Sequence, residues 1–128
     1  MTNPYVAENQ IHRNMSRYLP GDVVLVSIAI DTRAGAKIRP AVVVRSRGNG
    51  TVEICPVSSQ PPSDSASTSL SIDDFAQGGL DLFSASYVMT GRVFAIRNVD
   101  VIGKRGRLVP EYLRTILEEI PAGDRRGR

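Results

Sequence analysis

The sequence has few of the residues that build disulfides, metal sites and membrane spans. Its 128 residues include one cysteine, Cys55, and one histidine, His12, which excludes an internal disulfide framework and a cysteine-based zinc site. No apolar run approaches the roughly 20 residues that a membrane span needs. Residues 1–10 lack the basic start and apolar stretch of a signal peptide. We therefore expect one small cytoplasmic domain that binds no metal or other cofactor.

Lysine is also scarce, since 14 of the 16 basic residues are arginine. The formal net charge is only +3, and three arginines set against Asp124 in the last five residues account for +2 of it. A guanidinium binds a phosphate with better geometry than the ammonium group of lysine does, but it also serves in ordinary surface ion pairs. The charge therefore permits a nucleic-acid partner without arguing strongly for one.

The apolar pattern predicts a β-rich domain. Six short segments are expected as strands: residues 23–30, 40–44, 51–56, 70–72, 86–89 and 93–96. Asn49-Gly50 supplies the positive φ of a tight turn between the second and third of them. Cys55 is expected as a small buried residue of the third strand. Residues 60–68 are rich in proline and serine and predict a loop.

The last third of the chain predicts one helix. Pro110 suits the first turn of a helix, and apolar residues then recur at helical spacing at Leu113, Ile116, Leu117 and Ile120, which predicts one buried face. Residues 73–76, followed by Gly78-Gly79, predict a single helical turn stopped by glycine. Short strands with one terminal helix give a small barrel-like α+β domain.

The ends of two predicted strands bring a cation and several hydroxyls together. Arg39 precedes the apolar run 41–44, and the next strand ends in Ser58, Ser59 and Gln60. A guanidinium beside hydroxyl and amide donors suits a phosphate. Two structural alternatives stay open: Arg39 could form a strand-edge ion pair, and the serines could bond backbone groups in a turn.

Three motifs in this order resemble the MazF/PemK family of toxin endoribonucleases. They are Gly21-Asp22 before a strand, Arg39-Pro40 before a strand, and the turn Pro56-Val57-Ser58-Ser59-Gln60. The stretches Gly78-Gly79-Leu80 and Ser86-Tyr87-Val88 and the terminal helix resemble the second half of the family. The resemblance runs from about residue 20 to 120, leaving an N-terminal extension (1–19) and a basic C-terminal tail (121–128) outside it.

The resemblance implies an α+β, mainly β fold: a small SH3-like β-barrel of the MazF/PemK/CcdB type with a C-terminal helix, paired as a homodimer. It also implies that the protein is the toxin of a type II toxin-antitoxin system and that a cognate antitoxin inhibits it. Its activity would be metal-independent cleavage of single-stranded mRNA through attack by the 2′-hydroxyl. The family's catalytic arginine falls on Arg39 and its catalytic threonine on Ser58, which keeps the hydroxyl.

The resemblance and the charges together give five expected RNA contacts: Arg33, Lys37, Ser59, Gln60 and Arg92. Many relatives carry an acidic residue in the loop before the catalytic arginine, and this chain has none between residues 33 and 37. Arg92 takes the place of a glutamine common in relatives, so it could clamp RNA or pair with Asp81 or Asp100.

Two other functions remain open at this point. One is a barrel of the same fold that binds a protein target, as the gyrase-poisoning relatives do, and the other is a degenerate homologue without activity. The pair of Arg39 and Ser58 favours the endoribonuclease, since a barrel that only binds a protein needs neither group.

Overall fold

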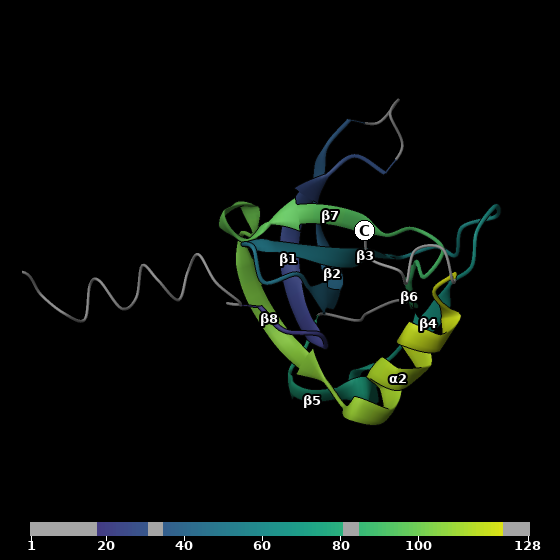
Figure 1. The fold of residues 1–128 in the computed structure, drawn as a ribbon. Helices are drawn as coiled ribbons and strands as arrows, with labels where there is room; N and C mark the ends of the chain where they lie inside the picture. The colour runs from purple at the N-terminus through teal and green to yellow at the C-terminus, as the bar shows by residue number, and fades with distance from the viewer. Residues whose placement is uncertain (1–17, 31–34, 81–84, 122–128) are drawn as a thin grey trace, which may run out of the picture.

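The computed structural model describes residues 18–30, 35–80 and 85–121. Within these ranges the chain forms eight strands (Figure 1): β1 (Asp22–Ile28), β2 (Lys37–Ser46), β3 (Thr51–Ser58), β4 (Thr68–Leu70), β5 (Phe75–Gly78), β6 (Ser86–Val88), β7 (Phe94–Arg97) and β8 (Gly103–Leu108). The other regular elements are the 3-10 turns η1 (Ile72–Asp74) and η2 (Asn98–Asp100) and the helix α2 (Pro110–Glu119).

The strands form one antiparallel sheet that curls into a half-barrel. Its order is β4-β6-β3-β2-β1-β8-β5, and β7 pairs with β3 outside this path. In Figure 1, α2 lies at the lower right, between edge strand β5 and the strands β4 and β6. The expected small, mainly β barrel with a C-terminal helix is confirmed.

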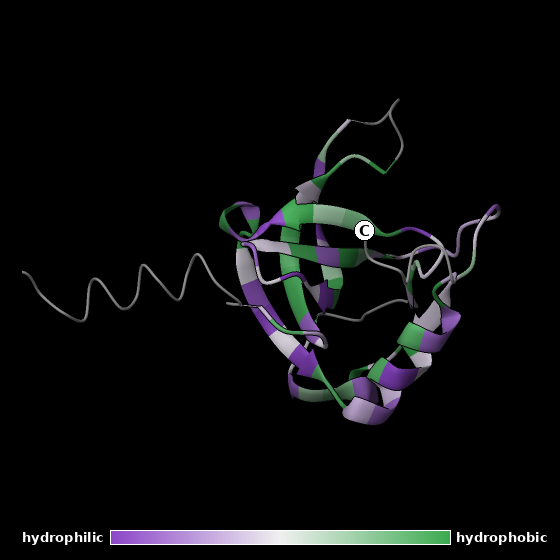
Figure 2. Cartoon of the chain, viewed as in Figure 1, coloured by the Kyte–Doolittle hydropathy of each residue, from purple (hydrophilic) through white to green (hydrophobic). Residues whose placement is uncertain are grey.

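Both faces of the central strands β1, β2 and β3 are buried, in two separate apolar clusters. Neighbouring residues of a strand point to opposite faces, so Val42 packs in one cluster with Ile116 of α2. Val43 packs in the other with Ile54 and Tyr18. Figure 2 shows the hydrophobic residues gathered on these strands. The unbroken apolar run of residues 41–44 follows from burial on both sides.

The terminal helix closes the half-barrel as its sequence predicts. Pro110 occupies its first turn, and Ile116 and Ile120 are buried against the core while Leu117 is partly buried there. The hydroxyl of Tyr112 donates a hydrogen bond to the backbone oxygen of Ser69 in β4. Burial, aided by the nearby Asp74 carboxylate, raises the pKa of Tyr112 well above its ordinary value.

Several local predictions were wrong. The helical turn expected over 73–76 is the 3-10 turn η1, one residue earlier, and Phe75 already begins β5. The edge strand expected over 70–72 is instead β4, Thr68–Leu70. At the turn between β2 and β3 the positive φ angles belong to Gly48 and Gly50, and Asn49 has none. Its carboxamide oxygen instead accepts a hydrogen bond from the Thr51 amide.

Strands β5 and β8 were not predicted at all. They pair with each other, and they approach so closely that a Cβ on Gly78 would lie 2.2 Å from the Arg105 carbonyl oxygen. Gly78 also has a φ of +65°, a conformation that favours glycine. The Gly78-Gly79 pair therefore serves the contact between two strands and does not end a helix.

Tyr18 belongs to the expected N-terminal extension, yet it is only 6% exposed and packs in the core. Residues 1–17, which include His12, lie outside the described part of the chain, as do Arg33, Asp81 and the tail from residue 122. Among the helices that the structure describes, none is long and apolar enough to cross a membrane.

Candidate active site

Arg39 and Ser58 lie at the same end and on the same face of the sheet. Arg39 of β2 pairs with Val26 of β1, and the ladder between β2 and β3 ends at the pair Ala41 and Pro56. Arg39 and Ser58 each stand two residues beyond that pair, in the same direction along the sheet. Residues two apart on a strand share a face, so both side chains project from the face that carries Ala41 and Pro56.

The Arg39 side chain has a buried donor without a partner. Its Nε atom is inaccessible to solvent and makes no hydrogen bond within the described residues, although the residue as a whole is only half-buried. Buried polar atoms of native proteins are nearly always bonded. Because Nε itself is inaccessible, an incoming anion would meet the exposed remainder of this half-buried side chain, whose guanidinium carries the charge.

Ser58 ends β3 and serves partly as a turn residue. Its Oγ accepts a hydrogen bond from the Gln60 amide at 3.2 Å, so the expected structural alternative for this serine is present. The hydroxyl can still donate its proton, because accepting one bond does not use the O–H. Ser58 also pairs across the sheet with Tyr87 of β6, a neighbour that the sequence analysis did not single out. Only the strand register reveals this half-buried aromatic residue.

Three of the expected RNA contacts are exposed around this pair. Lys37 begins β2, two residues before Arg39 and on the same face, while Ser59 and Gln60 follow directly after β3. Arg33 lies outside the described residues. The strand ends thus present one ammonium group and two short polar side chains near Arg39 and Ser58.

Within the described residues, Arg92 contacts Ile30 and Asp64 and does not pair with Asp100, while Asp81 lies outside them. Its Nη1 donates a hydrogen bond to the Ile30 carbonyl oxygen at 3.2 Å, and its Nη2 lies 3.5 Å from Oδ2 of Asp64. Asp100 instead pairs with Arg97, at 3.1 Å between Nε and Oδ2. Arg92 therefore connects the segment after β1 with the loop after β3.

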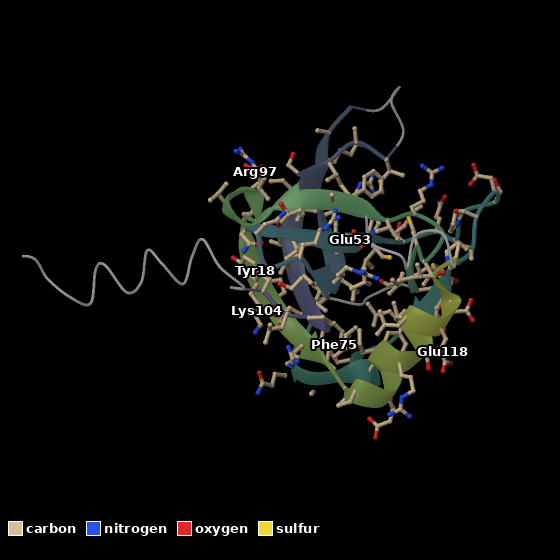
Figure 3. The ribbon with its side chains drawn as sticks, in the orientation of Figure 1. Tyr18, Glu53, Phe75, Arg97, Lys104 and Glu118 are labelled. Carbon is tan, nitrogen blue, oxygen red and sulfur yellow. The ribbon has the colours of Figure 1, made fainter. Side chains whose placement is uncertain are left out.

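Two buried carboxylates were missed, and both hold the scaffold together. Asp22 accepts hydrogen bonds from Arg107 at 2.7 Å and from the Leu19 amide at 2.9 Å, and it lies 3.2 Å from Nζ of Lys104. Glu53, labelled on β3 in Figure 3, forms ion pairs with two arginines that flank the β2–β3 turn, Arg45 and Arg47. The Gly21-Asp22 motif thus has a structural purpose.

No three His, Cys, Asp or Glu side chains of the described ranges gather closely enough to hold a metal ion. What the sheet end does offer is a cation with an unbonded donor beside a hydroxyl that can donate. This arrangement can bind an oxyanion and stabilise negative charge that develops on it.

Comparison with known proteins identifies the family to which this chain belongs. The sequence model for the PemK-like, MazF-like toxins of type II toxin-antitoxin systems matches residues 19–122. Since the match spans most of the chain, the protein belongs to this toxin family. None of the curated proteins compared with the chain matches it.

Solved structures show a similar fold. The Mycobacterium tuberculosis toxin MazF-mt6 superposes with a TM-score of 0.56 at 16% sequence identity, covering 77% of this chain and 91% of the other. An endoribonuclease solved in complex with its cognate antitoxin, from a mycobacterial species, has a TM-score of 0.47 at 16% identity, covering 84% and 98%. At such identities the similarity concerns the fold.

Proposed function

We propose that this toxin is an endoribonuclease that cleaves single-stranded RNA, with Arg39 and Ser58 in its active site. Family membership supports the toxin role. The observation that carries the site is the buried, unbonded Nε of Arg39, at the sheet end and on the face that it shares with Ser58. Its substrate would be mRNA, so the protein would act in the cytoplasm.

The reaction needs proton transfer and charge stabilisation. The 2′-hydroxyl of one nucleotide loses its proton as its oxygen attacks the adjacent phosphorus, and the bond from phosphorus to the 5′-oxygen breaks. The 5′-oxygen takes up a proton, so a 2′,3′-cyclic phosphate and a 5′-hydroxyl remain with no net change in protons. Arg39 stabilises the negative charge of the phosphorane, because a guanidinium that stays protonated is a poor base. Ser58 donates a hydrogen bond from its hydroxyl to a non-bridging oxygen, and the hydrogen bond from the Gln60 amide holds its Oγ in place.

The strand to be cleaved would run over the exposed polar groups beside this pair. Lys37, Arg33 and Arg92 supply cations for the backbone, and Ser59 and Gln60 supply short hydrogen-bonding groups. Because the toxin would need no cofactor to act, its control falls to a protein partner. An antitoxin with a flexible acidic segment would occupy the same surface by replacing the phosphates.

The test is incubation of the full chain with a mixed-sequence single-stranded RNA in the presence of EDTA. We expect fragments that end in 2′,3′-cyclic phosphate. Arg39→Ala should slow cleavage on the order of a hundredfold or more, and Arg39→Lys, which keeps the charge but lacks Nε and the planar fork, should rescue it only in part.

Intact RNA with the wild-type chain, or near-wild-type cleavage by a folded Arg39→Ala variant, would overturn the proposal. The first of these outcomes would favour the barrel that binds a protein target.

A further inference from the structure

Arg92 joins two segments that border the pair of Arg39 and Ser58. Its Nη1 is bonded to the carbonyl oxygen of Ile30, just beyond the end of β1. Its Nη2 contacts Asp64, in the loop that follows β3. One side chain therefore spans the space between the strand end before Arg39 and the loop after Ser58.

The backbone that carries Arg92 is firmly held to β3. The Met89 amide donates to the carbonyl oxygen of Pro56 at 2.8 Å, and the Gly91 amide donates to that of Ala66 at 3.0 Å. The loop packs so closely here that a Cβ on Gly91 would lie 2.8 Å from the Ala66 nitrogen. The segment that leads to Arg92 is thus bonded at Met89 to β3, two residues from the candidate catalytic serine, and at Gly91 to the loop after β3.

The two contacts of the guanidinium differ in strength. The bond to Ile30 is an ordinary hydrogen bond at 3.2 Å, whereas the contact to Asp64 is long at 3.5 Å and the Asp64 side chain is 70% exposed. Exposed ion pairs contribute little to stability. Asp64 can therefore be displaced at small cost, while the Ile30 carbonyl keeps the guanidinium oriented.

We propose that Asp64 is an internal competitor of RNA for Arg92. The inference rests on the proposed function, in that it takes the backbone of RNA as the ligand. In the free protein the carboxylate occupies Nη2 of Arg92, and a phosphate of the bound strand takes its place. Carboxylate and phosphate oxygens make the same charge-assisted bonds to a guanidinium, so a phosphate that takes the N–H facing Asp64 must displace the carboxylate.

Two consequences follow for binding. Asp64 weakens the affinity for RNA, and it penalises ligands that place a phosphate at Arg92 more than anions bound elsewhere on the surface. A second role for Asp64 is possible in principle: it could hold Arg92 in the orientation that RNA needs. The two roles predict opposite effects when the carboxylate is removed, since a competitor weakens binding and a positioning group strengthens it.

The experiment compares Asp64→Asn with Asp100→Asn in the full chain. Both changes remove one negative charge from an exposed ion pair. Asp100 pairs with Arg97, which lies on the opposite side of the molecule from β4 and β6 (Figure 3). The probe is a fluorescein-labelled, mixed-sequence RNA whose 2′-hydroxyls are all 2′-O-methylated, so that it binds without being cleaved. Affinity is measured by fluorescence anisotropy over a range of salt concentrations.

Asp64→Asn should tighten RNA binding about two- to fivefold at low salt, and Asp100→Asn should leave it nearly unchanged. The difference should fade near about 0.5 M salt, because at that ionic strength the interaction between exposed charges is screened beyond a few ångströms. Combining Asp64→Asn with Arg92→Gln completes the test. The glutamine keeps an amide donor but carries no charge, so the gain from Asp64→Asn should vanish in that background.

Weaker binding by Asp64→Asn, or binding equal to that of Asp100→Asn, would overturn the proposal. A gain that survives in the Arg92→Gln background would also overturn it, because Asp64 would then repel RNA directly. The comparison of the two asparagine variants decides the matter even if Arg92→Gln fails to fold. If the wild type and both asparagine variants all fail to bind RNA, the proposed function itself fails.

Discussion

Asp22 is a buried carboxylate with three polar contacts, and replacing it with asparagine should destabilise the fold. The carboxylate is buried, with a side-chain exposure of 2%, and it contacts two cations and one backbone amide. Asparagine keeps the shape but loses the charge, and its NH₂ group would face donors where an acceptor is needed.

The size of the loss follows from the exposure of the partners. Removing one member of a fully buried ion pair costs about 3–5 kcal/mol. Here the Arg107 and Lys104 side chains are 37% and 46% exposed, so water can solvate them once the carboxylate is gone. We therefore expect a loss of about 2 kcal/mol in the free energy of unfolding, the range of a charged hydrogen bond.

Urea unfolding followed by circular dichroism measures this loss, and thermal unfolding should show a midpoint lower by about 5–10 °C. Asp100→Asn is the matched control, because that carboxylate is 49% exposed and should contribute less than about 0.5 kcal/mol. If Asp22→Asn cost no more than this control, the buried network would not be what fixes β8 to β1.

Three further outcomes are expected. Ser58→Ala should slow RNA cleavage by about tenfold or more, and less than Arg39→Ala does, whereas Ser58→Thr should stay active; a folded but inactive threonine variant would contradict the role of the hydroxyl. Because the pKa of Tyr112 is raised in the folded protein, the unfolded chain loses this proton first, so stability should fall as the pH rises above about 10. Tyr112→Phe should show a smaller fall in urea unfolding between about pH 9 and 11, and an unchanged slope would refute this contribution. The protein should form a symmetric homodimer, as the small core and exposed apolar residues such as Ile38 suggest, and light scattering that shows a monomer at micromolar concentration would count against it.

The local part of the fold could be predicted from the sequence. Runs of β-branched residues indicate β1, β2 and β3, and a glycine-containing turn joins the last two as a hairpin. Since neighbouring strands of a hairpin share their ends, the sequence also predicts that Arg39 and Ser58 approach each other. Pro110 and the helical spacing from Leu113 onward indicate α2 for the same reason: each signal lies within a few residues of the element that it predicts.

The non-local part could not be predicted. Strand β8 contains Lys104, Arg105 and Arg107, which hide its strand character. Two of these cations, Lys104 and Arg107, pair with Asp22, which lies 85 residues away from Arg107 in the sequence. The contact between Arg92 and Asp64 was missed for a similar cause, and Asp100, one of the expected partners, pairs with Arg97 instead. The sequence offers several aspartates as partners for Arg92. Only the folded structure shows that the loop after β3 brings Asp64 to its guanidinium.

These ion pairs also explain why the arginine content is a poor guide to RNA binding. Five of the described arginines form an ion pair with an acidic side chain of the protein. Arg45 and Arg47 pair with Glu53, Arg92 with Asp64, Arg97 with Asp100 and Arg107 with Asp22. A guanidinium that is already paired gains less from a phosphate, because it must give up one anion to take another. Arg39 differs, since its buried Nε is bonded to none of the described residues. The binding of RNA should therefore depend mainly on the few guanidinium donors at the end of the sheet that have no acidic partner. It should depend much less on the net charge of +3.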